Sequence, residues 1–268
     1  MRVGCQTYTW QMLGDAWRGT MGDVLDAIAA AGFAGVETTW QMLGPLLDNP
    51  ERFGDMLARR GLSLAALALS PPTGWSDPSA EAAELALADR AIEFLSALGL
   101  GGRLGLGGGR APSRAQYREK FDQMIRMYHA VARRAVDRGL VVHVHPTSTD
   151  DSLLLVGAEY QMLVDRLDPA LVGLGPDTAH ITRGDERALD FVRRNARRIT
   201  HIHLKDAFRG GDYATMGTAD AEIEAVAAFL RDFGYTGWLI AEEESDSAGA
   251  DPATSVRSCR AYLAARGF

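Results

Sequence analysis

Cysteine is scarce in this sequence, long apolar runs are missing, and positive charge is not in excess. The two cysteines, Cys5 and Cys259, lie at opposite ends of the chain, so they form neither a metal-binding pair nor a disulfide framework. No apolar run approaches the roughly 20 residues that span a membrane, and the N-terminal residues lack the apolar core of a signal peptide. We therefore expect a cytoplasmic protein that does not enter a membrane.

The shortage of basic residues bears on the class of partner. Lysine and arginine together number 28 against 35 acidic residues, and the formal net charge is -7. An acidic surface repels phosphate backbones, so nucleic acid is a poor partner and a small molecule is favoured. The length of 268 residues, with 47% hydrophobic residues, suits one large domain covering residues 1–268.

Short β-like runs alternate with longer segments whose apolar residues have helical spacing. Glycines such as Gly32, Gly139 and Gly234 follow the helical segments, where a left-handed helix end is needed. This alternation favours parallel strands, and eight units favour a single α/β (β/α)8 TIM barrel over an open doubly wound sheet. The predicted strands are Arg2–Tyr8, Gly35–Thr39, Ser63–Leu69, Gly102–Leu106, Leu140–His145, Val172–Asp177, Thr200–Lys205 and Trp238–Glu243.

The seventh predicted strand places His201, His203 and Lys205 on one face, because side chains alternate along a strand. Ile202 and Leu204 would then face the helices, and the polar residues would face the lumen. Three polar groups in a packed lumen are costly unless they bind something. We interpret them as contacts to a metal ion or an anionic substrate at the C-terminal mouth of the barrel, where such barrels build their active sites.

Acidic residues end the sixth and eighth predicted strands. Asp177 lies three residues before His180 and can serve either as a metal ligand or as the N-cap of a helix. Glu242 and Glu244 share a face at the end of the last strand, and an acidic exit into solvent is the alternative interpretation. The nearby His180 favours the ligand role for Asp177, whereas both interpretations of Glu242 and Glu244 stay open at this point.

The fifth predicted strand adds His143 and His145, which share a face. Four neighbouring strands thus direct imidazole and carboxylate groups to one mouth. This mixed set favours one divalent ion such as Mn, Co, Zn or Fe(II) over calcium or a thiolate site. Near the end of the second strand, Glu37 faces either the lumen or a structural arginine, and Trp40 is a candidate for the apolar wall of a sugar site.

Taken together, these motifs resemble the xylose-isomerase-like barrels, also called sugar phosphate isomerases/epimerases, over nearly the whole chain. The matching motifs are Gly35–Glu37, Asp177–His180, His201–Asp206 and the late strand that ends in Glu242. The resemblance implies that Asp177, His203 and Glu242 bind one divalent metal ion. It also implies that His180 and Arg209 contact the substrate.

One departure from the family pattern concerns the fourth ligand. Most members have a glutamate near the end of strand five, whereas this chain has His143, which we expect as the fourth ligand. Inosose dehydratases of the same superfamily are similar in strand five, in the stretch His203–Arg209 and in the acidic stretch Glu242–Asp246. The resemblance therefore favours a dehydratase acting on a keto-inositol or keto-sugar.

The expected chemistry is removal of a proton next to a carbonyl. His145 is the leading general acid or base, because an imidazole titrates near neutral pH, and Glu244 and Lys205 are alternatives. Glu37 and Trp40 are expected to contact substrate together with His180 and Arg209. The alternatives are a sugar isomerase or ketose epimerase, a non-catalytic sugar-binding barrel, and an endonuclease, which the negative charge disfavours. A homo-oligomer is compatible with the sequence, and nothing in it tests that state.

Overall fold

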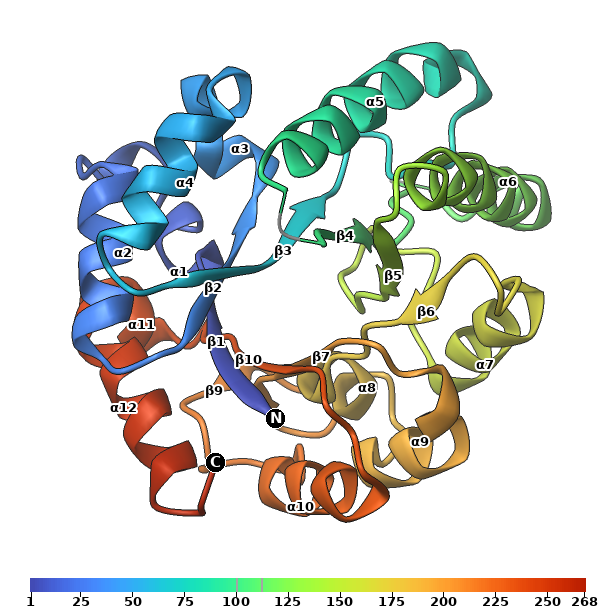
Figure 1. Cartoon of the computed structure of the whole chain (residues 1–268). Helices are drawn as coiled ribbons and strands as arrows, with labels where there is room; N and C mark the ends of the chain where they lie inside the picture. The colour runs from blue at the N-terminus through green and yellow to red at the C-terminus, as the bar shows by residue number, and fades with distance from the viewer. Residues whose placement is uncertain (100, 112) are drawn as a thin grey trace.

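Eight parallel strands form one sheet, and helices surround it on the outside (Figure 1). The computed structural model describes residues 1–99, 101–111 and 113–268. Along the sheet the order is β6-β5-β4-β3-β2-β1-β10-β7. The strands are β1 (Arg2–Gln6), β2 (Gly35–Thr39), β3 (Ser63–Leu69), β4 (Arg103–Gly107), β5 (Val141–His145), β6 (Gly173–Leu174), β7 (Ile202–Leu204) and β10 (Trp238–Ala241). The predicted (β/α)8 barrel is confirmed.

The two outer strands of this sheet, β6 and β7, meet and bring the barrel to closure. Isolated parallel bridges pair Leu174 with Ile199 and Asp177 with His203. The His203 N–H donates to the carbonyl of Pro176 at 2.9 Å. The strand predicted at Val172–Asp177 is shorter in the structure because Pro176 has no N–H to donate to a ladder. Its last residue nevertheless stays beside β7.

Among the described residues, eight longer helices form the outer ring and pack their apolar faces inward. Helix α2 shows how the sequence starts one: the Thr20 hydroxyl accepts from the N–H of Asp23, and Asp23 accepts from the N–H of Thr20. The outer helices are α2 (Met21–Ala30), α4 (Pro50–Ala58), α5 (Glu81–Ala97), α6 (Tyr117–Val136), α7 (Gly157–Arg166), α9 (Ala188–Asn195), α10 (Ile223–Phe233) and α12 (Pro252–Ala264).

Shorter elements follow the C-terminal ends of the strands and shape the mouth of the barrel. Four short helices lie there, together with a small antiparallel pair, β8 and β9, that the sequence analysis did not predict. These elements are α1 (Tyr8–Gln11), α3 (Trp40–Leu43), α8 (Thr178–Arg183), α11 (Asp246–Ala250), β8 (Asp206–Ala207) and β9 (Tyr213–Ala214). The remaining helical turns are Gly14–Ala16, Gly44–Asp48, Pro78–Ala80 and Ala196–Arg198.

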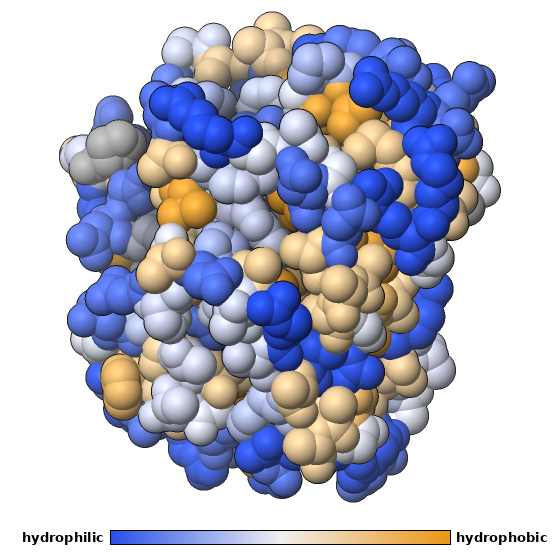
Figure 2. Space-filling view, turned by 90° about the vertical axis from the view of Figure 1, so that its left-hand side faces the viewer, coloured by the Kyte–Doolittle hydropathy of each residue, from blue (hydrophilic) through white to orange (hydrophobic). Residues whose placement is uncertain are grey.

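On the outer surface, hydrophilic residues are interspersed with small groups of hydrophobic ones across the face shown in Figure 2. The large hydrophobic residues that are exposed come from scattered positions: Met1, Val136, Val141, Val156, Phe208 and Phe233. Within the described residues, we find no helix with both the length and the apolar character to cross a membrane.

Candidate metal centre

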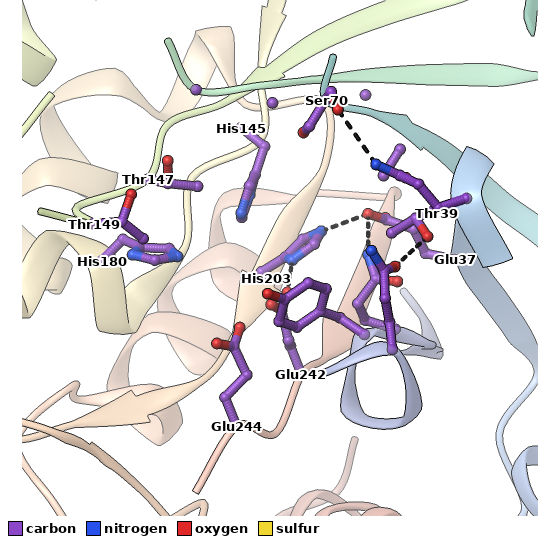
Figure 3. A pocket seen from close by; sticks show the side chains of 18 of the residues that line it. Glu37, Thr39, Ser70, His145, Thr147, Thr149, His180, His203, Glu242 and Glu244 are labelled. Atoms are coloured by element: carbon purple, nitrogen blue, oxygen red, sulfur yellow. Dashed lines mark hydrogen bonds and ion pairs between the residues drawn. The ribbon is translucent and has the colours of Figure 1, made fainter. Parts of the chain in front are cut away.

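Four side chains converge in the barrel mouth, and three of them, His145, His203 and Glu242, line a cavity of about 240 Å³ (Figure 3). His145 is the last residue of β5, Asp177 follows β6, His203 lies in β7 and Glu242 follows β10. One ligand atom from each lies within 4.8 Å of the others. We call these residues the four-residue group. Adjacent parallel strands bring them together because their C-terminal ends share one rim of the barrel.

The two carboxylate oxygens of Asp177 have different surroundings. Its Oδ1 accepts the N–H groups of Ala179 at 2.7 Å and His180 at 3.0 Å, and so caps helix α8. Its Oδ2 is buried and has no hydrogen-bond partner among the described residues, although the Lys205 Nζ lies 3.3 Å away. The two interpretations of this residue from sequence, cap and ligand, are therefore compatible.

His203 lies between two carboxylates. Its Nδ1 contacts the Oε2 of Glu242, and its Nε2 lies 3.0 Å from the Oε1 of Glu37. Burial alone would lower the pKa of His203, but Glu37 and Glu242 raise it well above its usual value. The two ring nitrogens thus face different partners, with Nδ1 on the side of the four-residue group.

His145 is suited to act as a neutral ligand. Its Nδ1 lies 3.2 Å from the carbonyl oxygen of Gly175, the geometry in which Nδ1 carries the hydrogen and Nε2 keeps its lone pair. Burial, reinforced by His203, lowers the pKa of His145 to about 4. The ring centroids of His145 and His203 are 4.2 Å apart.

His143 lies apart from the four-residue group, although the sequence pattern favours it as the fourth ligand. Its ring stacks on that of His201 with centroids 4.3 Å apart, and neither ring nitrogen has a hydrogen-bond partner among the described residues. It fills the space beside two glycines: a Cβ on Gly105 would lie 2.8 Å from its Nε2, and one on Gly175 would lie 2.4 Å from its Cδ2. Burial holds the pKa of His143 well below its usual value.

Lys205 is fully buried next to the group and is surrounded by acidic residues. Its Nζ lies 3.1 Å from the Oε1 of Glu242 and 2.7 Å from the Oε1 of Glu244. Burial by itself would lower the pKa of Lys205, but the carboxylates, Asp177 first, raise it well above its usual value. Burial also raises the pKa of Glu244 to about 8, with Lys205 opposing the shift and Glu242 adding to it.

The residues predicted to bind substrate divide into two sets. Glu37 and His180 line the cavity together with Glu244. Trp40 does not line it, and its Nε1 donates to the Ser70 carbonyl at 3.5 Å. Arg209 is turned away from the cavity, with its Nη1 3.3 Å from Asp185. The structure therefore gives no contact between Trp40 or Arg209 and the cavity.

Glu37 faces the lumen and pairs with histidines rather than with an arginine. It is buried at the end of β2, and its Oε2 lies 2.5 Å from the Nε2 of His201. Burial would raise the pKa of Glu37, but His203 and His201 hold it well below its usual range. Glu37 is therefore paired with His203 in β7 and with His201 immediately before it.

Several residues that line the cavity were not predicted from the sequence. Gln6 ends β1 on its lumen face, two residues after Gly4, so strand alternation was a usable signal. Tyr213 lies in β9, and its ring is 4.5 Å from the Lys205 Nζ. No sequence signal placed it there, because the short β8–β9 pair has no recognisable periodicity.

The chemistry of the four-residue group fits a divalent transition-metal ion. Two imidazoles and two carboxylates form the mixed nitrogen and oxygen set that Zn, Mn, Co and Fe(II) accept. The buried Oδ2 of Asp177 has no hydrogen-bond partner in the described chain, and a metal ion would satisfy it. The residues present therefore fit such an ion.

Comparison with known proteins relates the chain to one family. Residues 25–265 match the family model described as "Xylose isomerase-like TIM barrel". An inosose dehydratase of Bacillus cereus (strain AH820) is 27% identical over 164 residues, which make up 54% of this chain and 54% of that protein. The chain thus spans about half the length of the curated relatives it matches.

Solved structures agree in fold over nearly the whole chain. The IOLI protein with a binding zinc atom has a TM-score of 0.82 at 12% identity, covering 99% of this chain and 98% of that one. D-psicose 3-epimerase with D-tagatose, from Clostridium cellulolyticum H10, has a TM-score of 0.78 at 18% identity, covering 99% and 98%. At such identities the likeness shows the fold alone.

Proposed function

Since the chain belongs to the xylose isomerase-like TIM barrel family, we propose that it is a divalent-metal-dependent enzyme that enolises a keto-inositol or keto-sugar and eliminates water from it. The convergence of the four-residue group beside the cavity, which three of its members line, carries this proposal. A metal ion held there would act as a Lewis acid on a carbonyl oxygen and stabilise developing negative charge. The relationship to an inosose dehydratase supports this class of substrate.

The cavity suits a small polyhydroxylated molecule. Its volume of about 240 Å³ is small for a ligand site, since such sites span about 300–1,000 Å³. Amide and hydroxyl groups around its wall can donate to and accept from sugar hydroxyls. The residues with such groups are Gln6, Tyr8, Gln11, Thr39, Gln41, Ser70, Thr147, Thr149 and Tyr213.

Glu244 is the residue we propose for proton transfer. It lines the cavity, whereas Lys205 lies behind it with Nζ 2.7 Å from its Oε1. The carboxylate takes the proton from the carbon next to the carbonyl. The same carboxyl group returns that proton to the departing β-hydroxyl, so the C–O bond breaks, water leaves and the carboxylate is regenerated. Lys205 holds Glu244 in place and balances its charge. His145, the leading base by sequence, is instead proposed as a ligand.

The sequence of β5 supports elimination over epimerisation. The family resemblance implies that epimerases of the family use a glutamate near the end of strand five. In this chain β5 reads Val-Val-His-Val-His and has no glutamate. If the proton returned to carbon from the opposite face, the same site would epimerise its substrate. D-psicose 3-epimerase shares the fold, so epimerisation is the second candidate.

The test uses the full chain loaded in turn with Zn²⁺, Mn²⁺, Co²⁺ and Fe²⁺ and incubated with keto-inositols and 3-keto-sugars in D₂O. Loss of water with a new enone-type absorbance supports elimination. Deuterium incorporation without loss of water supports epimerisation and contradicts the lyase proposal. Binding of the sugars with neither reaction favours a non-catalytic barrel. Glu244→Gln should abolish turnover, and Glu119→Gln on the exposed face of α6 is the matched control.

A further inference from the structure

Glu37 lies in β2, which β1 and β10 separate from β7 in the sheet. Its side chain crosses the lumen and contacts His203 in β7. Its carboxylate is 2% exposed, and its three neighbours are all side chains that carry N–H groups. Oε1 accepts from the Gln6 amide nitrogen at 2.7 Å and makes a 3.0 Å ion-pair contact with the His203 Nε2, a nitrogen that forms no hydrogen bond within the described residues. Oε2 lies 2.5 Å from the His201 Nε2. Figure 3 shows Glu37 facing His203 on the side opposite Glu242.

The backbone fixes the direction of this hydrogen-bond chain. The Thr7 N–H donates to the Gln6 Oε1 at 2.7 Å, so the amide oxygen of Gln6 faces Thr7 and its NH₂ group faces Glu37. An amide nitrogen can only donate, and therefore Glu37 accepts from it. Because the Glu37 carboxylate acts as an acceptor, it favours the tautomer of His203 that carries its hydrogen on Nε2. In the neutral ring, Nδ1 then keeps its lone pair on the side of the four-residue group.

We propose that Glu37 is a positioning residue, which holds the ring of His203 through Nε2 so that Nδ1 presents its lone pair to the metal ion. This inference rests on the proposed function, because it requires a metal ion at the four-residue group. Metal-binding histidines commonly donate their second ring N–H to a carboxylate, which fixes the tautomer and strengthens the ligand. Here Gln6 and the Thr7 backbone hold that carboxylate in turn, so the support reaches back to β1.

Glu37, His201 and His203 also lie close enough together to hold an ion of their own. Two observations favour the positioning role over this second site. The Gln6 NH₂ group already donates to the Glu37 Oε1, which reduces that oxygen's capacity to bind a cation. His203 would also have to give both ring nitrogens to metal ions, which would require it to lose its last N–H proton.

The test measures metal affinity directly, by competition with a coloured chelator for Zn²⁺ and Co²⁺. Glu37→Gln should lower the affinity by about 10–100-fold, the usual effect of losing such a carboxylate. Glu84→Gln replaces another buried glutamate, bonded to Thr73 and Trp75 away from the centre, and should leave the affinity unchanged. His201→Gln should reduce the affinity less than Glu37→Gln, with one ion still bound.

Wild-type affinity in Glu37→Gln would overturn the inference while leaving the proposed function intact. Two ions in the wild type, falling to one in both Glu37→Gln and His201→Gln, would identify the second site instead. A wild-type chain that binds no ion would remove the proposed function itself. If Glu37→Gln does not fold, the metal-binding nitrogen can be identified by NMR of the cadmium-loaded wild type with labelled histidines. Coupling of cadmium to the Nδ1 of His203 is expected. Coupling to Nε2 would contradict the inference.

Discussion

Asp177 and His203 are paired across the seam where the barrel closes, since an isolated parallel bridge joins their backbones. The same seam therefore brings the two outer strands together and sets two of the four candidate ligands side by side. The Asp177 Oδ1 accepts the N–H groups of α8, whereas Oδ2 accepts no hydrogen bond within the described residues and lies 3.3 Å from the Lys205 Nζ. Folding and the proposed ion binding would thus use different atoms of one side chain.

This division predicts that the two roles of Asp177 can be separated. Asparagine caps helices as well as aspartate does, whereas alanine at such a position costs about 0.5–2 kcal/mol. In metal-free protein, Asp177→Ala should therefore be less stable than Asp177→Asn, and both should lose metal affinity. Urea denaturation and chelator competition measure the two effects. Equal stability of the two variants would show that the cap contributes nothing.

His145 and His143 are expected to differ although they share one face of β5. His145→Ala should lower metal affinity strongly, because it removes a member of the four-residue group. His143→Ala should leave the affinity close to that of the wild type and instead destabilise the fold, since truncating a large buried side chain leaves a cavity and costs about 2–5 kcal/mol. Metal titration of both variants checks this. A loss of affinity in His143→Ala alone would restore His143 as the fourth ligand.

The room for His143 depends on a glycine in the neighbouring strand region. A Cβ on Gly175 would lie 2.4 Å from the His143 ring, so Gly175→Ala must displace the ring and should destabilise the protein by about 1–3 kcal/mol. Gly249→Ala in α11 is the control, because its Cβ would meet nothing closer than 3.8 Å. Thermal unfolding of both should show a fall only for Gly175→Ala. An unchanged midpoint there would mean that the lumen at His143 is loosely packed.

Both thiols are expected to be inert in the folded protein. Burial raises the pKa of Cys5 and of Cys259 far above the ordinary value, with Glu242 adding to the shift at Cys5 and Glu243 at Cys259. The thiolate is the reactive form, so a raised pKa leaves less of it at any mildly alkaline pH. A thiol-reactive dye should label neither residue until denaturant is added. Rapid labelling of either thiol in native protein would contradict its burial.

Much of the barrel followed from the sequence, because apolar alternation and glycines after helices are local signals. The bounds of β2 and β3 agree with those predicted at Gly35–Thr39 and Ser63–Leu69. The sequence did not show which of His143 and His145 joins the candidate metal ligands. Alternation assigns both to the lumen face, but depth along the lumen depends on the stagger between strands, which is a property of the closed barrel.

Contacts across the lumen could not be predicted from the sequence for a similar reason. The pairing of Glu37 with His201 and His203 joins residues far apart in the chain, and no local spacing encodes it. Arg209 was assigned to the substrate by family resemblance alone. The turn between β8 and β9 directs it to Asp185 instead, outside the cavity.

His145, Asp177, His203 and Glu242 are proposed to hold one divalent ion together. Equilibrium dialysis of the wild type and of His203→Ala against Zn²⁺, Co²⁺, Mn²⁺ and Fe²⁺, followed by elemental analysis, tests it most directly. We predict one tightly bound ion per wild-type chain for at least one of these metals and loss of that ion in His203→Ala. A wild-type chain that binds none of them, or a variant that retains the ion with wild-type affinity, would contradict the account.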